Sequence, residues 1–309
     1  MSLYAFEESL IKAIQEGDLK MIEQLQLTSI DVNRKLMIHH KVPVQNIHLK
    51  RVFPELIDPT PVIFAIACEK SDVLYYFIEN LHPDLSICCN GWAPIHYAAI
   101  IEDPRCMQIL LKTEFVQTNV DFPIQSVLSK DISLTALNIA VSYSRHGQAL
   151  LLTQNFIQPE FDLEGNRILF KNTPVIDESS ILPADCLHKT VSGNTPLHIA
   201  TYRNDWDMCQ ILMSVMPDVN VLNDKEQTPA ELAKLYNHNE LAEKLTKAEL
   251  DPIETLIAKY LTKPSKPKCP CDEIPASEES VEEIRENINT LKETINNLYA
   301  TIDSLSNNK

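Results

Sequence analysis

The chain has 309 residues, with 27 Lys and Arg against 43 Asp and Glu, and a formal net charge of −16 at pH 7. This acidic balance argues against general affinity for nucleic acid or an anionic membrane. No segment approaches the roughly 20 consecutive apolar residues of a membrane-spanning helix, and the first residues lack the basic start of a secretion signal. The eight cysteines are scattered, which suits a reducing compartment, so we expect a cytoplasmic location, with the nucleus as the alternative.

Residues 1–27 contain two short apolar segments separated by a turn. The segments flank Gly17 and Asp18, and they supply apolar residues such as Ala13 and Ile22. We interpret this stretch as a two-helix unit that caps the N-terminal end of a stacked array.

Residues 28–57 form a stretch far longer than an ordinary turn between helices. Apolar residues alternate with polar ones along its second half, and they are Val42, Val44, Ile47, Leu49 and Val52. Alternation of this kind is typical of strands. We therefore predict an insertion that folds as a hairpin.

A proline-containing turn recurs along the chain at a fixed spacing. Pro61 and Pro94 are 33 residues apart, and the same 33 residues separate Pro196 and Pro229. This period indicates short helical units stacked into a solenoid, in which each unit buries its apolar face against its neighbours. Such an array is typical of proteins that bind rather than catalyse.

A second apolar segment at helical spacing follows each of these turns. Three such stripes are Val73, Leu74, Phe77 and Ile78; Met107, Ile109, Leu110 and Leu111; and Met208, Ile211, Leu212 and Met213. We predict that these stripes form the core between neighbouring units.

The turns themselves carry the most specific pattern. Residues 91–99 read GWAPIHYAA and residues 193–201 read GNTPLHIAT. Both resemble the ankyrin-repeat signature, a turn followed by T-P-L-H-x-A, and further units begin at Thr135, where the proline is missing, and at Thr228. In this pattern Gly adopts the positive φ that a tight turn often needs, Thr caps the next helix and Pro is its first residue.

The resemblance implies an all-α fold, an ankyrin-repeat solenoid of helix-turn-helix units with long insertions. It assigns residues 58–155 and 191–262 to repeats and leaves residues 156–190 as a second insertion. The C-terminal block ends in a predicted helix at residues 251–261, which we expect to pack over the exposed end of the stack.

No segment carries a recognisable catalytic or cofactor-binding motif. The chain lacks a phosphate-binding glycine loop, G-x-S-x-G and H-E-x-x-H. The resemblance implies that His96 and His198 are structural, each hydrogen-bonded to backbone groups of a neighbouring repeat. Cys269 and Cys271 are one residue apart with no second pair nearby, too few ligands for a zinc site. We expect a non-enzymatic protein without cofactor or metal.

Beyond a Pro- and Lys-rich linker at residues 263–277, residues 278–309 place apolar residues at alternating steps of three and four. The seam consists of Val281, Ile284, Ile288, Leu291, Ile295, Leu298, Ile302 and Leu305. Four heptads with β-branched first positions and mostly Leu at the fourth predict a coiled coil that forms a parallel homodimer. The flanking positions do not fix the partner, and a helix folded back onto the array is the alternative.

The ankyrin resemblance also implies where a protein partner would bind. The turn tips and the exposed side of the first helices form the concave face of such arrays. The matching residues are Asn90, Trp92, Ile100, Ile101, Ser192, Asn194, Tyr202, Arg203, Lys225, Gln227 and Tyr236. Trp92 has two interpretations, an aromatic anchor for a partner or a side chain packed on the neighbouring insertion.

We therefore expect a scaffold or adaptor that binds proteins through this concave face and self-associates through its C-terminal helix. The alternative is a regulatory or substrate-recruiting subunit of an enzyme complex, with the coiled coil docked on a different protein.

Overall fold

The computed structural model describes residues 3–37, 41–44, 46–113, 115–116, 119–124, 134–154, 160–161, 167–168, 183–216, 218–248 and 250–261. The chain divides into two units, Met1–Leu261 and Thr262–Lys309. Every described residue belongs to the first unit. The linker at 263–277 and the predicted seam from Val281 to Leu305 lie outside the described residues, so the coiled coil stays a prediction.

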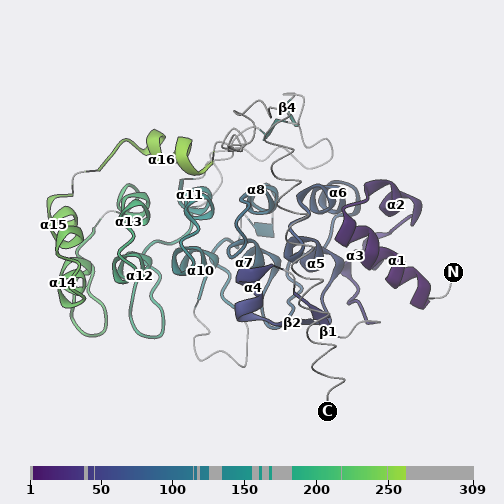
Figure 1. Cartoon of the computed structure of the whole chain (residues 1–309), viewed down its shortest axis with the longest axis horizontal. Coiled ribbons are helices and arrows are strands. Elements are labelled where there is room, and N and C mark those ends of the chain that lie inside the picture. Colours follow the sequence, from purple (N-terminus) through teal and green to yellow (C-terminus); the bar gives the residue numbers. More distant parts are fainter. Residues whose placement is uncertain are drawn as a thin grey trace, which may run out of the picture. The chain divides into compact units, whose positions relative to one another are not determined.

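The first unit is built from two rows of short helices (Figure 1). The inner row consists of α5 (Pro61–Ala67), α7 (Pro94–Ala98), α10 (Ala136–Ser142), α12 (Pro196–Tyr202) and α14 (Pro229–Leu235). The outer row consists of α6 (Ser71–Leu81), α8 (Arg105–Leu111), α11 (His146–Gln154), α13 (Trp206–Met213) and α15 (Asn239–Lys247). Each inner helix packs against the outer helix that follows it and against the next inner helix.

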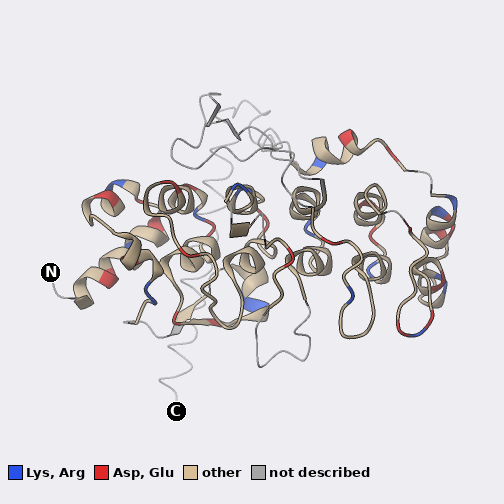
Figure 2. Ribbon diagram, turned by 180° about the vertical axis from the view of Figure 1, so that it is seen from behind, with Lys and Arg blue, Asp and Glu red and all other residues tan. Residues whose placement is uncertain are grey.

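Loops lead into the inner helices α7, α12 and α14, and we call these loops fingers. Figure 1 shows the fingers before α12 and α14 projecting past the inner row. Basic and acidic residues are interspersed along the ribbon (Figure 2), so the charge of the array is mixed rather than segregated. No helix among the described residues is long and apolar enough to cross a membrane.

The inner helices begin at the threonine and proline residues that the sequence predicts. The hydroxyl of Thr60 accepts a hydrogen bond from the Ile63 N–H at 3.3 Å, and that of Thr228 accepts one from the Glu231 N–H at 3.2 Å. In every inner helix except α10, a proline follows as the first helical residue, where a missing N–H leaves no bond unmade. Local sequence therefore sets the start of each repeat.

The two signature histidines are structural, as predicted. In His96, Nδ1 accepts from the Ala93 N–H at 3.0 Å and Nε2 lies 2.8 Å from the Phe122 carbonyl oxygen. His198 repeats the arrangement, with Nε2 3.0 Å from the carbonyl oxygen of Gln227 in the next finger. Each imidazole thus joins the start of its own helix to the following repeat.

The outer helices bury the stripes predicted from their spacing. Val73, Leu74 and Phe77 of α6 are fully buried, as are Met208, Ile211 and Leu212 of α13. The turns between inner and outer helices then reverse the chain with left-handed residues. Asn204 and Asn237 have φ of 56° and 62°, a geometry that asparagine tolerates better than most residues.

Helices α1 (Leu3–Glu16) and α2 (Leu19–Gln24) form the helix pair at the N-terminal end. Gly17 makes the turn between them with φ of 75°, and the Asp18 carboxylate caps α2 by accepting from the Met21 N–H at 3.1 Å. α1 packs against α5, and α2 packs against α6. This pair covers the apolar side of the first inner and outer helices.

The insertion at residues 28–57 is only partly the predicted hairpin. After α3 (Ser29–Asn33), strand β1 (Lys41–Pro43) pairs antiparallel with β2 (Glu55–Ile57). The residues between them form α4 (Ile47–Val52), capped by Asn46, whose side-chain oxygen accepts from the N–H groups of His48 and Leu49. The prediction of strand alternation across residues 47–52 was wrong because this Asn cap starts a helical turn that buries Leu49 alone.

The insertion at residues 156–190 contains a second short pair of strands. β3 (Glu160–Phe161) pairs antiparallel with β4 (Arg167–Ile168). With β1 and β2, these strands make the fold mostly helical rather than the all-α fold that was predicted. The predicted repeat from Thr135 forms α10 and α11, and Leu150, Leu151 and Leu152 of α11 are buried.

The last described helix, α16 (Ile253–Tyr260), does not cover the end of the stack, so that prediction was wrong. It packs on α11 and α13 of the outer row instead (Figure 1). The Tyr260 ring stacks on His146 with 4.3 Å between ring centroids, and Lys259 Nζ and the Tyr260 hydroxyl each lie 2.5 Å from Asp207 Oδ2. The last helices of the stack are α14 and α15, and the exposed residues of α15 include Glu240, Glu243 and Lys247.

Candidate protein-interaction surface

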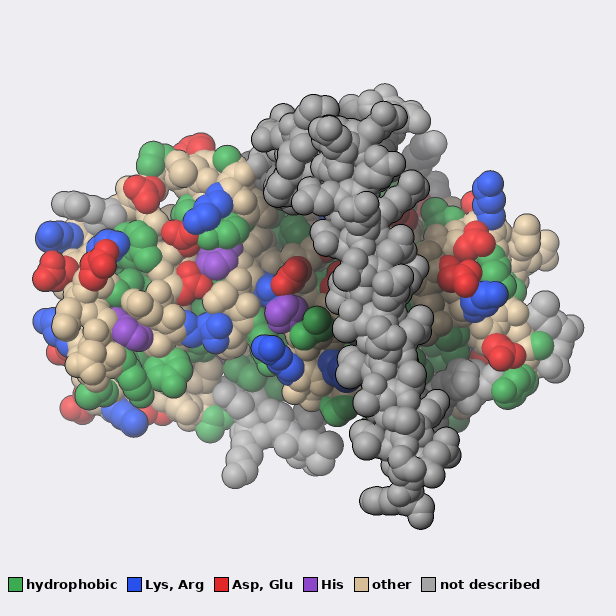
Figure 3. All heavy atoms as spheres, in the orientation of Figure 1, with side chains coloured by type: hydrophobic (Ala, Val, Ile, Leu, Met, Phe, Trp, Pro, Cys, Tyr) green, Lys and Arg blue, Asp and Glu red, His purple; other side chains and the backbone are tan. Residues whose placement is uncertain are grey.

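The inner helices all end on the same side of the array, and their last residues form equivalent positions. In the repeat of α7 these residues are Ile100 and Ile101, which lie seven and eight positions after Ala93, the N-cap residue of the helix. The same positions in the other repeats are Ser142 and Tyr143, Tyr202 and Arg203, and Leu235 and Tyr236. Figure 3 shows the face that carries these helix ends.

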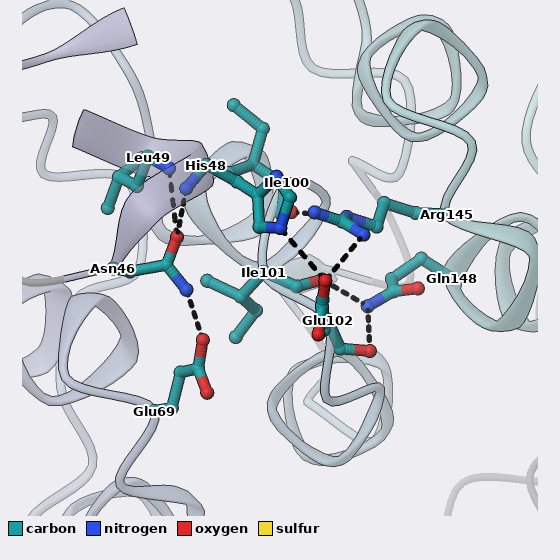
Figure 4. A network of polar contacts seen from close by, with 9 residues as sticks. All are labelled: Asn46, His48, Leu49, Glu69, Ile100, Ile101, Glu102, Arg145 and Gln148. Atoms are coloured by element: carbon teal, nitrogen blue, oxygen red, sulfur yellow. Dashed lines mark hydrogen bonds and ion pairs between the residues drawn. The ribbon is translucent and has the colours of Figure 1, made fainter. Parts of the chain in front are cut away.

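In the repeat of α7 these positions are covered. Ile100 and Ile101 are both 0% exposed, so the prediction that they contact a partner was wrong. Helix α4 of the insertion lies over this helix end, because His48 Nε2 is 2.8 Å from Glu102 Oε1 (Figure 4). On the other side, Arg145 Nε donates to the Ile100 carbonyl at 2.6 Å.

The same network fixes the insertion to the preceding repeat. The Asn46 side-chain amide hydrogen-bonds the carboxylate of Glu69, the residue nine positions after Thr60 (Figure 4). Glu102 is nine positions after Ala93, the equivalent place in the next repeat. Asn46 and His48 therefore attach the insertion to two successive turns of the array.

Trp92 and Asn90, also predicted to contact a partner, hold the other end of the insertion. Trp92 is buried, and its ring lies edge-on to Phe53 with 5.0 Å between centroids. The Asn90 side chain accepts from the Ile57 N–H at 3.0 Å and donates to the Glu55 carbonyl at 3.2 Å. The interpretation of Trp92 as packed on the insertion is the one that the structure supports.

The equivalent positions in the C-terminal repeats are open. Tyr202 is 56% exposed, Leu235 60% and Tyr236 45%. The two tyrosine rings meet edge to face with 4.8 Å between centroids, and this geometry is the favourable one for aromatic pairs. The surface is therefore apolar, ordered by its own contacts, and not covered by any described segment.

Arg203 extends this surface towards the neighbouring repeat. Its Nε donates to the Ser144 hydroxyl at 3.2 Å, which places it beside Tyr143. Burial raises the pKa of the Tyr143 hydroxyl, so that hydroxyl remains a hydrogen-bond donor. We call Tyr143, Tyr202, Arg203, Leu235 and Tyr236 the turn-end strip. In Figure 3, hydrophobic and basic side chains lie together over α12 and α14.

The predicted finger residues divide into two kinds. Ser192 and Lys225 are exposed near the finger tips. Asn194 and Gln227 are half-buried and help to join adjacent fingers, because Asn223 Nδ2 lies 3.0 Å from Asn194 Oδ1 and the Gln227 N–H donates to Asn223 Oδ1 at 3.0 Å. The two exposed residues can reach a partner, whereas the other two shape the fingers.

Tyr143 and Leu235 were missed by the sequence analysis. Counting seven and eight residues from Thr135 and Thr228 would have found both, because Tyr202 and Arg203 follow Thr195 at the same distances. The missing proline after Thr135 made that repeat less visible.

Among the described residues, no three His, Cys, Asp or Glu side chains are grouped so that they could hold a metal ion. The described cysteines are free thiols, and burial raises the pKa of Cys89 to about 11. A thiol protonated at neutral pH is a poor nucleophile.

Comparison with known proteins identifies a repeat at the centre of the strip. Residues 192–224 match the family model described as Ankyrin repeat. Over 64 residues, or 21% of this chain, the sequence is 38% identical to the ARF GTPase-activating protein Git of Drosophila melanogaster, and this segment spans 9% of that protein. Ankyrin repeats imply protein–protein interaction, and the matched residues include Tyr202 and Arg203.

Proposed function

We propose that this chain is a non-catalytic scaffold or adaptor that binds partner proteins through the turn-end strip, with Ser192 and Lys225 at the finger tips extending the surface. The observation that carries the proposal is the contrast between repeats. The helix-end residues are 0% exposed in the repeat of α7 and 45–60% exposed at Tyr202, Leu235 and Tyr236.

The composition of the strip supports this role. Tyrosine and arginine are enriched among the residues that contribute most to protein interfaces, because they combine a large apolar body with polar groups. A stable interface buries about 800 Å² on each partner, and a large aromatic side chain contributes about 150–250 Å² when fully buried. Tyr202 and Tyr236 are 56% and 45% exposed, so each would add part of that area to an interface.

Quantitative affinity capture tests the proposal. The wild-type chain and the double variant Tyr202→Ala, Tyr236→Ala are used as baits, and Tyr4→Ala, an exposed tyrosine on α1, is the matched control. The best candidate is then purified and titrated calorimetrically. We expect the double variant to weaken its binding at least about tenfold and the control to leave it unchanged; equal binding by all three would contradict the proposal.

We also propose that the chain self-associates as a parallel homodimer through the seam from Val281 to Leu305. The support is the sequence pattern of four heptads, and two linked arrays would bind a multivalent partner more tightly than one. Light scattering of the full chain and of a truncation ending at Leu261 tests this. A dimer that becomes a monomer on truncation is expected, whereas a monomer in both cases favours the alternative of an enzyme complex with a different coiled-coil partner.

A further inference from the structure

We propose that the turn-end strip selects an acidic segment of its partner, in which an Asp or Glu side chain pairs with Arg203 and a neighbouring apolar side chain packs on Tyr202 and Tyr236. This inference rests on the proposed function and names the chemistry of the partner.

The insertion shows how this array holds a segment on its helix ends. Residues 46–57 place polar side chains against the carboxylates of Glu69 and Glu102 beyond the helix ends, and they place an aromatic ring, Phe53, against Trp92 beside the start of α7. An apolar contact and polar contacts to carboxylates thus act together. Because the bound segment belongs to the same chain, it reports directly on the chemistry that this face accepts.

The charge of the helix ends changes from the N-terminal to the C-terminal repeats. Nine residues after the N-cap position, the first two repeats carry Glu69 and Glu102, whereas the later ones carry Ser144, Asn204 and Asn237. The acidic side chains that Asn46 and His48 contact therefore have no counterpart at this position in the open repeats.

A cation stands beside these neutral residues. Arg203 is exposed, and it forms no ion pair with the described part of the chain. The nearest carboxylate in the sequence, Asp205, is already paired, because its Oδ1 lies 2.8 Å from His146 Nε2. The open repeats thus present a cation, Arg203, one position before the neutral Asn204, whereas the covered repeats carry Glu69 and Glu102 at the position of Asn204.

The geometry of arginine and tyrosine fits a carboxylate. A guanidinium presents several N–H donors in one plane, which match the two oxygens of a carboxylate. The tyrosine hydroxyls supply further donors, and the edge-to-face pair of Tyr202 and Tyr236 offers ring surface for an aliphatic or aromatic side chain. An acidic residue next to an apolar one satisfies both contacts.

Panning a library of random, unmodified peptides on the full chain tests this inference. We expect the enriched peptides to share Asp or Glu beside an aliphatic or aromatic residue. A synthetic peptide with the enriched sequence should bind Arg203→Glu and Tyr202→Ala at least about tenfold more weakly than wild type. Lys20→Glu, an exposed charge reversal on α2, is the matched control and should bind as wild type.

A reciprocal exchange separates charge pairing from loss of structure. Replacing the acidic peptide residue with Lys should restore binding to Arg203→Glu, and unfolding curves should show that this variant is as stable as wild type. Enrichment of basic peptides whose binding is lost in Tyr202→Ala would overturn the acidic partner and leave the proposed function standing. Binding unaffected by either strip variant would overturn both, and a library without enrichment would overturn the present inference.

Discussion

The first two repeats and the last two repeats use the same local plan and differ in what covers their helix ends. In the repeat of α7, Ile100 and Ile101 lie beneath the insertion and belong to the core. In the repeats of α12 and α14, Tyr202 and Tyr236 occupy the equivalent positions and face solvent. An insertion of this chain has thus converted one part of the concave face into interior and left another part as surface.

The insertion is a built part of the fold rather than a loose cover. Its own Val42, Val44, Leu49 and Leu56 are all buried, and burying one such side chain contributes about 1.5–3 kcal/mol. The hydrogen bonds between the Asn90 side chain and the backbone of β2 also fix the position of this strand on the array. A partner would have to displace this whole cluster to reach α5 and α7, so the open repeats are the favoured place for binding.

The largest expected effect comes from removing the core of the insertion. Leu49→Ala should lower the free energy of unfolding by about 2–5 kcal/mol, because Leu49 is fully buried and its truncation leaves a cavity. Leu235→Ala in the open region should change it by less than about 0.5 kcal/mol, because Leu235 is 60% exposed. Denaturant titration of both variants measures the contrast, and similar losses would break the comparison.

The second effect concerns pH and the buried histidine of the covered repeats. Burial lowers the pKa of His96 to about 4 from an ordinary value of 6.5. As the pH falls from 6.5 to 4, the unfolded chain takes up a proton that the folded imidazole does not, so stability falls, by about 3 kcal/mol in all. Burial also lowers the pKa of His198, which acts in the same direction.

Replacing His96 by asparagine isolates its share of this pH dependence. Asn138 stands at the same position in the repeat of α10, so the array already accommodates this residue. The free energy of unfolding of His96→Asn, measured by denaturant titration at several pH values, should vary less between pH 6.5 and 4 than that of wild type. An unchanged slope would show that the acid sensitivity lies elsewhere.

A third, smaller effect tests the attachment of α16 to the outer row. Asp207→Asn removes the charge that binds Lys259 and the Tyr260 hydroxyl, and it should cost about 1–2 kcal/mol of stability in α16. Hydrogen exchange should show faster opening of α16 and unchanged protection of α14. Glu254→Gln, an exposed substitution on the same helix, serves as the control, and equal exchange in both variants would contradict the attachment.

The smallest effect sharpens the account of the fingers. Glu226 is exposed with φ of 58°, a left-handed geometry that favours glycine. Glu226→Gly should raise the free energy of unfolding by up to about 1 kcal/mol. Glu243→Gly within α15 should instead lower it by about 1 kcal/mol, and thermal unfolding of the pair measures both. A destabilised Glu226→Gly would mean that the finger does not depend on this geometry.

Local features of the array could be predicted from the sequence. The starts of the inner helices follow from Thr and Pro, the buried stripes from helical spacing, and the bonds of His96 and His198 from the repeat signature. Tyr202 and Tyr236 were also predicted as surface residues, because the ankyrin resemblance implies that they lie on the exposed side of the first helices.

Contacts between distant segments could not be predicted. Packing of Trp92 on the insertion was one of two interpretations and is confirmed by its contact with Phe53, but no local pattern showed that Ile100 and Ile101 would be buried. Likewise, the apolar face of α16 fits the end of the stack and the outer row equally well, until Tyr260 is placed beside His146 and Asp207. Alternation at residues 47–52 was ambiguous because a short helix and a strand can bury the same single leucine.

The most direct test of the account is residue-resolved hydrogen exchange of the insertion in the full chain. If residues 41–57 fill the concave face of the first repeats, the amides of Val44 and Ile57, which bond to Pro54 and Asn90, should be protected to within about tenfold of those in α7. Exchange of these two amides at the rate of an unfolded chain, with α7 still protected, would contradict the account. It would mean that the N-terminal face opens readily and that the two regions offer equivalent surfaces.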